Sequence, residues 1–177
     1  MPTSSPSGKK KIRQWVSTLQ VNRVLDVGCG EGTYPKLLKD TYKILENAEW
    51  WGIEAWTKYI EEFNLHQLYD VVLNDDARKI QWDKLPTFDL VIFGDVLEHM
   101  TKEESQLLVS SALSKSHYVI ISIPIVHSPQ DAVDGNPFEI HVKDNWSHPE
   151  VLESFPNIID SQGTKKIGVY LLKGVTH

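Results

Sequence analysis

Residues 24–32, with the sequence VLDVGCGEG, constrain the fold more than any other segment of this chain. An apolar run enters a turn with three alternating glycines, and residues that favour a helix follow it. Glycine adopts positive φ angles without strain and has no Cβ, so the backbone of such a turn can approach a ligand closely. The first amides of the next helix then face the same ligand. The segment therefore predicts a strand, a turn and a helix that bind a nucleotide-containing cofactor.

The spacing and charge of this turn narrow the class of cofactor. A dinucleotide turn has the pattern GxGxxG and holds a pyrophosphate, whereas this chain has GxGxG with Glu31 inside it. A carboxylate there repels a pyrophosphate and attracts a ligand with ammonium and sulfonium groups. At these residues the sequence resembles motif I of the class I S-adenosylmethionine-dependent methyltransferases, in which the loop surrounds the methionine part of the cofactor. A glycine turn of another α/β protein is the alternative.

Length and composition limit the remaining classes of function. The chain has 177 residues, which suffices for one domain, and we expect a flexible tail at residues 1–8 and a single domain at 9–177. The net charge of −6 disfavours nucleic acid as a partner and favours a small-molecule acceptor. The lone cysteine, Cys29, favours the cytoplasm, and no apolar run approaches the ~20 residues of a membrane span. A homodimer is also compatible with the sequence.

Apolar runs and helical patterns alternate along most of the chain. Strands are expected at residues 23–27, 50–54, 69–73, 88–93 and 118–123. Helices are expected at residues 12–19, 36–45 and 57–63, and a further helix starts at a capping box of Thr101 and Glu104. This alternation implies right-handed crossovers and a doubly wound parallel sheet.

Residues 124–149 break this pattern, because they are polar and contain four prolines and three of the seven histidines. We expect a long active-site loop there. A short helix at 149–155 and two strands at 158–160 and 166–172 follow. The resemblance then implies an α/β fold with a doubly wound, mostly parallel seven-stranded sheet in the order 3-2-1-4-5-7-6, the last strand antiparallel, with helices on both faces.

Ligands of open α/β sheets bind beyond the carboxyl ends of the strands, so residues at these ends should share one crevice. The resemblance implies that Glu54 accepts the ribose hydroxyls of S-adenosylmethionine. It also implies that Asp75 or Asp76 binds the adenine amino group, with Asp76 preferred because it precedes Ala77. The residues expected to bind the cofactor are Asp26, Gly28, Cys29, Gly30, Gly32, Glu54, Trp56, Asp75, Asp76, Ala77, Asp95 and Val96.

Residues 94–100, GDVLEHM, resemble the DVLEH segment of the small-molecule branch of the family. The (D/N)PP(Y/F) tetrapeptide of DNA-base amino methyltransferases does not occur at this place. Asp95, Glu98 and His99 are spaced so that they share one face of a helical turn, and with His141 they could hold a divalent cation. Because Glu98 and His99 can equally brace the loop, no metal ligand is predicted from the sequence.

Methyl transfer from a sulfonium depends mostly on alignment of the two reactants and on exclusion of water. An alcohol or phenol acceptor also needs a base that titrates near neutrality, and His99, His127 and His141 are the candidates. Phe138, Glu139 and Trp146 are expected to form a substrate wall.

The sequence therefore predicts a cytoplasmic enzyme that transfers a methyl group from S-adenosylmethionine to oxygen or nitrogen of a small molecule. An NAD-dependent oxidoreductase is disfavoured by the acidic loop and its glycine spacing. A non-catalytic, cofactor-binding partner of another methyltransferase subunit is compatible with the same motifs. Aminopropyl transfer usually requires a further acidic site, which the sequence does not identify.

Overall fold

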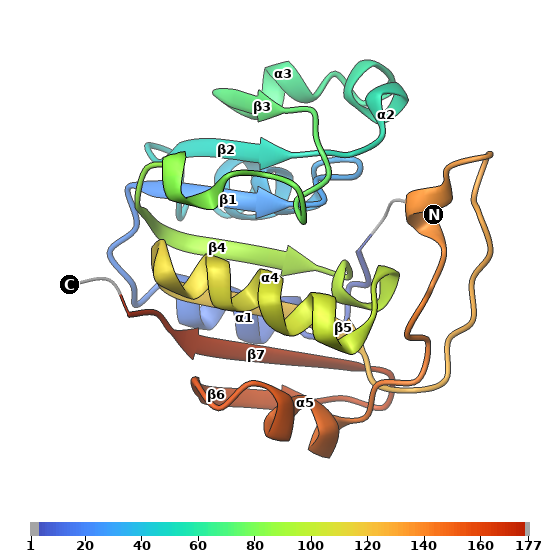
Figure 1. The fold of residues 1–177 in the computed structure, drawn as a ribbon. Helices are drawn as coiled ribbons and strands as arrows, with labels where there is room; N and C mark the ends of the chain where they lie inside the picture. The colour runs from blue at the N-terminus through green and yellow to red at the C-terminus, as the bar shows by residue number, and fades with distance from the viewer. Residues whose placement is uncertain (1–3, 176–177) are drawn as a thin grey trace.

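The computed structural model describes residues 4–175, within which seven strands form one mixed sheet in the order β3-β2-β1-β4-β5-β7-β6. The strands are β1 (Arg23–Val27), β2 (Glu49–Ile53), β3 (Val71–Leu73), β4 (Phe88–Gly94), β5 (Ser116–Pro124), β6 (Ile158–Gly163) and β7 (Ile167–Lys173). Strands β1 to β5 are parallel to their neighbours in that group, whereas β7 is antiparallel to both β5 and β6. In Figure 1 the arrow of β7 points in the opposite direction to the arrows of β1, β2 and β4. The expected strand order and the antiparallel last strand are confirmed.

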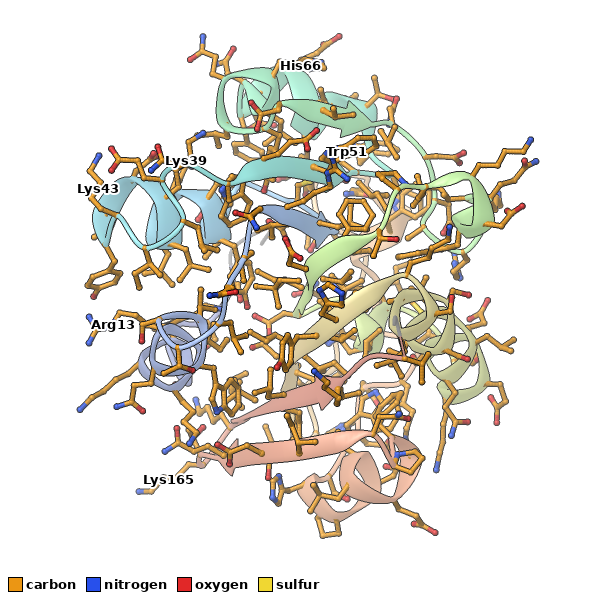
Figure 2. All side chains as sticks on the ribbon, turned by 90° about the vertical axis from the view of Figure 1, so that its left-hand side faces the viewer. Arg13, Lys39, Lys43, Trp51, His66 and Lys165 are labelled. Carbon is orange, nitrogen blue, oxygen red and sulfur yellow. The ribbon has the colours of Figure 1, made fainter. Side chains whose placement is uncertain are left out.

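Helices cover both faces of this sheet, as expected. The helical segments are α1 (Lys9–Val16), η1 (Pro35–Thr41), α2 (Thr57–Glu62), α3 (Leu65–Leu68), η2 (Trp82–Lys84), η3 (Leu97–His99), α4 (Lys102–Ser114), η4 (Pro137–Glu139) and α5 (His148–Ser154). Figure 2 shows α1 and α4 on opposite sides, with the labelled Arg13, Lys39 and Lys43 on the α1 side. Among the described residues, no helix has the length and apolarity needed to cross a membrane.

The two faces of the sheet bury two separate apolar clusters, because successive side chains of a strand point to opposite sides. Leu25 of β1 and Val91 of β4 pack with α4 and α5 in one cluster. Val24 and Leu90, their neighbours in sequence, pack with α1, η1 and α3 in the other. Strands that are covered on both faces read as continuous apolar runs, which is why these central strands could be predicted from the sequence.

Most elements differ from their expected bounds by one to four residues; the helix expected at 12–19, for example, is α1 at Lys9–Val16. Two of these differences follow from specific contacts. The helix expected at 36–45 is a shorter π-helix, Pro35–Thr41, and the amide of Tyr42 donates to the carbonyl of Leu37 at 3.1 Å. The chain reverses at Lys43, whose φ is +57°, so the helix cannot continue. Strand β3 starts at Val71 rather than at residue 69, since Tyr69 still belongs to the end of α3, where its amide donates to the carbonyl of Leu65 at 3.0 Å.

The helix expected from the capping box is α4. The amide of Glu104 donates to the hydroxyl of Thr101 at 3.2 Å, and the amide of Thr101 donates to the carboxylate of Glu104 at 2.8 Å. This reciprocal pair satisfies two amides that the helix leaves without partners. The helix therefore starts where these two residues predict it.

Candidate active site

The carboxyl ends of β1, β2, β4 and β5 border one cavity of about 300 Å³. The arrowheads of β1, β2 and β4 point toward this side of the molecule, where the long loop between β5 and α5 also lies (Figure 1). The expected cofactor-binding residues that line it are Gly28, Cys29, Gly30, Glu54, Asp75, Asp76, Ala77, Asp95 and Val96. Strand ends from distant parts of the chain thus share one crevice, as the rule for open α/β sheets predicts.

The glycine turn has the backbone conformation that its sequence requires. Gly28, Gly30 and Gly32 have φ angles of +70°, +49° and +77°. The amides of Gly28 and Cys29 donate to the carbonyl of Ile53 at 2.8 and 3.1 Å, which fastens the turn to the end of β2. A Cβ on Gly28 would lie 2.6 Å from a methyl carbon of Val96. Glycine is therefore needed at position 28 for both its φ angle and its size.

Glu54 is held rigidly at the end of β2. Its carboxylate accepts a hydrogen bond from the amide of Gly30 at 3.0 Å and another from the amide of Trp56 at 2.9 Å. Burial raises the pKa of Glu54, and these two backbone amides lower it in part. Each carboxylate oxygen still has a lone pair that can accept a hydroxyl proton. The residue can therefore hold a pair of neighbouring hydroxyl groups in the cavity.

Several expected site residues lie outside the lining of this cavity. Asp26 is buried behind the turn, where the hydroxyl of Tyr69 donates to its carboxylate at 2.6 Å. Burial raises the pKa of Asp26 to about 7. Gly32 and Trp56 also do not line the cavity, although Trp56 contacts the lining residue Phe138 edge-on at 6.5 Å between ring centroids. The structure therefore does not place Asp26, Gly32 or Trp56 in the lining of the cavity.

The two acids that follow β3 both line the cavity but differ in their contacts. Asp75 accepts the amide of Asp76 at 2.8 Å. Asp76 accepts two guanidinium nitrogens of Arg78, with the closest contact at 2.7 Å, and Arg78 also reaches Glu104 at 3.0 Å. Burial raises the pKa of Asp76, but the hydrogen bonds from Arg78 outweigh this effect and lower it overall. Asp76 is thus the more firmly oriented of the two carboxylates.

Asp95 follows β4 in a strained conformation, with a φ of +57°. Its carboxylate accepts the hydroxyl of Ser4 at 2.6 Å, the amide of Ser5 at 2.9 Å and the hydroxyl of Ser122 at 3.1 Å. Ser4 and Ser5 also line the cavity. The described part of the expected tail, residues 4–8, therefore makes specific contacts at the site, while residues 1–3 lie outside the described residues.

The histidines expected to act as bases separate into two groups. His99 and His141 both line the cavity, and their rings lie edge to face with centroids 4.9 Å apart. Burial lowers the pKa of His99, and the neighbouring His141 lowers it further. His127 lies outside the lining, with 71% of its side chain exposed and Nδ1 at 3.6 Å from Asp144. The structure does not bring His127 to the site.

Glu98 precedes His99 on η3, and its side chain is buried, with only 2% of the residue exposed. One ligand atom from each of Glu98, His99 and His141 lies within 4.8 Å of the others. Asp95, which the helical spacing also suggested, does not belong to this cluster, because η3 starts after it and its carboxylate faces Ser4 and Ser5. Burial raises the pKa of Glu98 well above its ordinary value.

The expected substrate wall is only partly formed. Phe138 and Glu139 line the cavity from η4. Trp146 does not, since it is 1% exposed and packs in the core with its ring 6.1 Å from that of Phe155. The expectation for Trp146 is therefore wrong, because an aromatic residue in a polar loop served here to anchor the loop.

Comparison with known proteins identifies the family. The model of a family described as "Methyltransferase domain" matches residues 24–114, which include the glycine turn, Glu54 and Asp95. The chain belongs to this methyltransferase family. No curated protein matches the chain.

Solved structures share the fold of this methyltransferase domain. The N-terminal domain of EvdMO1 with SAH bound is 15% identical, with a TM-score of 0.69, over 97% of this chain and 83% of that one. A S-adenosylmethionine-dependent methyltransferase from Clostridium acetobutylicum ATCC 824 is 13% identical, with a TM-score of 0.68, over 96% and 91%. Magnesium protoporphyrin IX methyltransferase from Synechocystis PCC 6803 with bound SAM is 16% identical, with a TM-score of 0.65, over 94% and 77%. At these identities the likeness concerns the fold alone.

Sequence reasoning on this methyltransferase domain missed several lining residues. These are Ser4, Ser5, Thr33, Tyr34, Arg78, Gln130 and Asn136. The contact of Ser4 with Asp95 joins residues 91 positions apart, so no local pattern could have indicated it. Arg78 had a detectable signal, since a basic residue two positions after Asp76 can pair with it.

Proposed function

We propose that this protein transfers a methyl group from S-adenosylmethionine to an oxygen or nitrogen atom of a small-molecule acceptor. The observation that carries the proposal is the carboxylate of Glu54, fixed in the cavity by the amides of Gly30 and Trp56. A buried carboxylate with two fixed oxygens matches the paired hydroxyl groups of a ribose. Membership of the methyltransferase family and the fold shared with methyltransferases that bind SAM or SAH support the same conclusion.

The residues of the cavity fit this cofactor along its length. The Gly28 turn offers a cradle that a Cβ would fill, and Asp75 or Asp76 at the end of β3 can accept the adenine amino group. When bound, S-adenosylmethionine supplies an electrophilic methyl group on a sulfonium. The carboxylate of Asp95 gives the other end of the cavity a negative charge that favours a cation. The protein's own contribution is to orient the reactants and to exclude water.

The acceptor end of the cavity carries His99 and His141. Each ring places Nδ1 against a backbone carbonyl, that of Ile140 for His99 and that of Ser128 for His141. A carbonyl only accepts, so Nδ1 carries the proton and Nε2 keeps a lone pair. Such a nitrogen can take a proton from the hydroxyl or amino group that is to be methylated, or it can bind a cation. We also propose a reducing cytoplasmic location, which the buried thiol of Cys29 supports.

Calorimetric titration of the purified chain with S-adenosylmethionine and with S-adenosylhomocysteine tests the proposal. We expect micromolar binding of both compounds to wild-type protein and at least tenfold weaker binding to Glu54→Gln, which keeps the shape of the side chain and removes its charge. The exposed residue Glu153 gives the matched control, and Glu153→Gln should bind like wild type. Absence of binding to the wild-type chain, or preferential binding of NAD in the same assay, would overturn the proposal.

A further inference from the structure

The acceptor end of the cavity contains three side chains of the kind that ligate metal ions. Glu98 and His99 come from η3, and His141 comes from the loop between β5 and α5. The amide of Lys143 donates to the carbonyl of Glu98 at 3.0 Å, and the amide of His141 donates to the carbonyl of Gln130 at 3.0 Å. Backbone hydrogen bonds therefore hold the loop against η3 and fix the place of His141 beside the other two groups.

Both imidazoles are oriented by backbone groups rather than by each other. Nδ1 of His99 lies 3.2 Å from the carbonyl oxygen of Ile140, and Nδ1 of His141 contacts the carbonyl oxygen of Ser128. Because a carbonyl cannot donate, these contacts assign the proton of each neutral ring to Nδ1 and leave Nε2 as an acceptor. Metal-binding histidines have this arrangement, in which the outer nitrogen donates to a carbonyl and the inner nitrogen binds the ion.

The carboxylate of Glu98 supplies an independent observation. Its Oε2 atom is buried and has no hydrogen-bond partner among the described residues. Burying a carboxylate oxygen without a partner is costly, and such an atom in a folded protein calls for an explanation. In the neutral rings of His99 and His141, Nδ1 donates to a backbone carbonyl, so neither of these N–H groups is available to Glu98. The cluster is thus a set of acceptors that a cation would satisfy together.

We propose that Glu98, His99 and His141 bind one divalent transition-metal cation at the acceptor end of the cavity. Two imidazoles with one carboxylate suit first-row ions such as Mn²⁺, Fe²⁺ or Co²⁺ better than Ca²⁺, which prefers oxygen ligands. Ligand atoms about 2.1 Å from an ion stand at most ~4.2 Å apart. The present separations of up to 4.8 Å therefore require a small inward movement of the side chains.

The place of this cation gives it a role in the proposed reaction. Glu98, His99 and His141 line the same cavity as Glu54 and Asp95, and three protein ligands would leave further coordination positions of a cation available to an acceptor in that cavity. An acceptor with a hydroxyl, or with two neighbouring oxygen atoms, can occupy such positions, and the ion lowers the pKa of the hydroxyl. This role rests on the proposed function, whereas binding of the cation does not.

The test measures metal binding directly on the full chain after removal of bound metals with a chelator. A titration with Co²⁺ that is monitored by calorimetry and by visible absorption should show one saturable site with micromolar affinity. Glu98→Gln and His141→Gln should each weaken this binding at least 100-fold. The matched control is His66→Gln on α3, a histidine outside the cavity that Figure 2 labels, and it should bind Co²⁺ like wild type.

Thermal unfolding keeps the test decisive if a variant folds poorly. Co²⁺ should raise the melting temperature of the wild-type chain and of His66→Gln, and it should leave that of a folded Glu98→Gln or His141→Gln variant unchanged. Absence of saturable Co²⁺ and Mn²⁺ binding to wild-type protein, or equal binding to all variants, would overturn the proposal.

Separate titrations distinguish this proposal from the proposed function. S-adenosylmethionine should bind the metal-free chain, because its expected contacts at Gly30 and Glu54 do not include the metal ligands. Co²⁺ binding without cofactor binding would support the metal site and reject the proposed function. Cofactor binding without Co²⁺ binding would support the proposed function and reject the metal site.

Discussion

The two ends of the cavity are built in different ways. The end that we propose binds the cofactor consists of the glycine turn, which starts at Gly28, and Glu54, 26 positions later; both follow adjacent parallel strands. The end that we propose binds the methyl acceptor, called the acceptor end, combines Ser4 and Ser5, the η3 segment and the loop that carries His141. A motif can encode the first end because its geometry is local. The second end depends on contacts between distant segments, so its residues become a site only in the folded chain.

The largest expected effect comes from the glycine that joins the two ends. Gly28 has a φ of +70°, and a Cβ would lie 2.6 Å from the side chain of Val96, which follows β4. Gly28→Ala must therefore displace the turn or Val96. We expect the affinity for S-adenosylmethionine to fall more than 100-fold, or about 3 kcal/mol, as measured by calorimetry.

Gly135 provides the control for this variant. It has a φ of +76°, yet a Cβ there would meet no atom within 4 Å. Gly135→Ala thus carries the same backbone strain of about 1 kcal/mol without the clash, and cofactor affinity should stay within twofold of wild type. Equal losses in both variants would show that strain, rather than the contact between the ends, controls binding.

The second prediction concerns the pH dependence of the free energy of unfolding, which depends on whether the buried carboxyl group of Asp26 is neutral. Its pKa of about 7 lies above the ordinary value of 3.8, chiefly because of burial. The facing groups are Tyr69, which donates to it, Lys9, whose charge lowers its pKa, and Glu54, whose charge raises it. At a pH between these two pKa values, the carboxyl group of Asp26 is protonated in the folded state and ionised in the unfolded state. Stability should therefore fall as pH rises from about 4 to about 7 and then level off.

Asp26→Asn keeps an acceptor for Tyr69 and removes this titration. Chemical denaturation between pH 5 and pH 8 should show that wild type loses about 2–3 kcal/mol more than the variant does, at about 1.4 kcal/mol per pH unit. Parallel stability curves for the two proteins across this range would contradict the assignment of a neutral Asp26.

A smaller effect separates the two acids at the end of β3. Asp76 is oriented by Arg78, with a closest contact of 2.7 Å, whereas the carboxylate of Asp75 accepts the neighbouring amide of Asp76. We expect Asp76→Asn to weaken cofactor binding about tenfold, or ~1.4 kcal/mol. Asp75→Asn should change it less than twofold in the same calorimetric assay. The opposite ranking would assign the adenine contact to Asp75.

The smallest effect concerns a feature that lies in neither end of the cavity. Thr101→Ala removes the capping hydroxyl of α4, and the free energy of unfolding should fall by about 1 kcal/mol. Ser111→Ala in the same helix removes a hydroxyl that donates only to the carbonyl of Leu107, and stability should change by less than about 0.5 kcal/mol. Cofactor affinity should be unchanged in both variants, so a loss would mean that α4 positions the site.

The sequence predicted those features whose physical cause is local. Strand β1 was expected at its observed bounds, and the capping box of Thr101 and Glu104 forms as expected. The positive φ angles of the glycine turn follow from the glycines themselves. Glu54 lines the cavity as expected because a residue that ends a parallel strand must face the crevice.

The sequence did not predict correctly whether certain side chains lie in the core or line the cavity. Asp26 resembles a cofactor-binding acid, but its carboxylate faces Tyr69 behind the turn. Trp146 was expected in the substrate wall, but it fills the core beside Phe155. In both cases the side-chain direction follows from the packing of another element, which the residue's own neighbours in sequence do not encode.

The sequence by itself determined the central strands, the conformation of the glycine turn and the place of Glu54 at a strand end, because hydrophobic periodicity and backbone sterics act over a few residues. The order of the strands was implied by the resemblance to the methyltransferase family and is confirmed by the structure. Only the tertiary structure decided the acceptor end. It placed Ser4 against Asp95, moved His127 away from the cavity, and brought His141 to Glu98 and His99. These positions depend on how a loop 42 residues beyond His99 packs back onto η3, and such closure is a property of the whole fold.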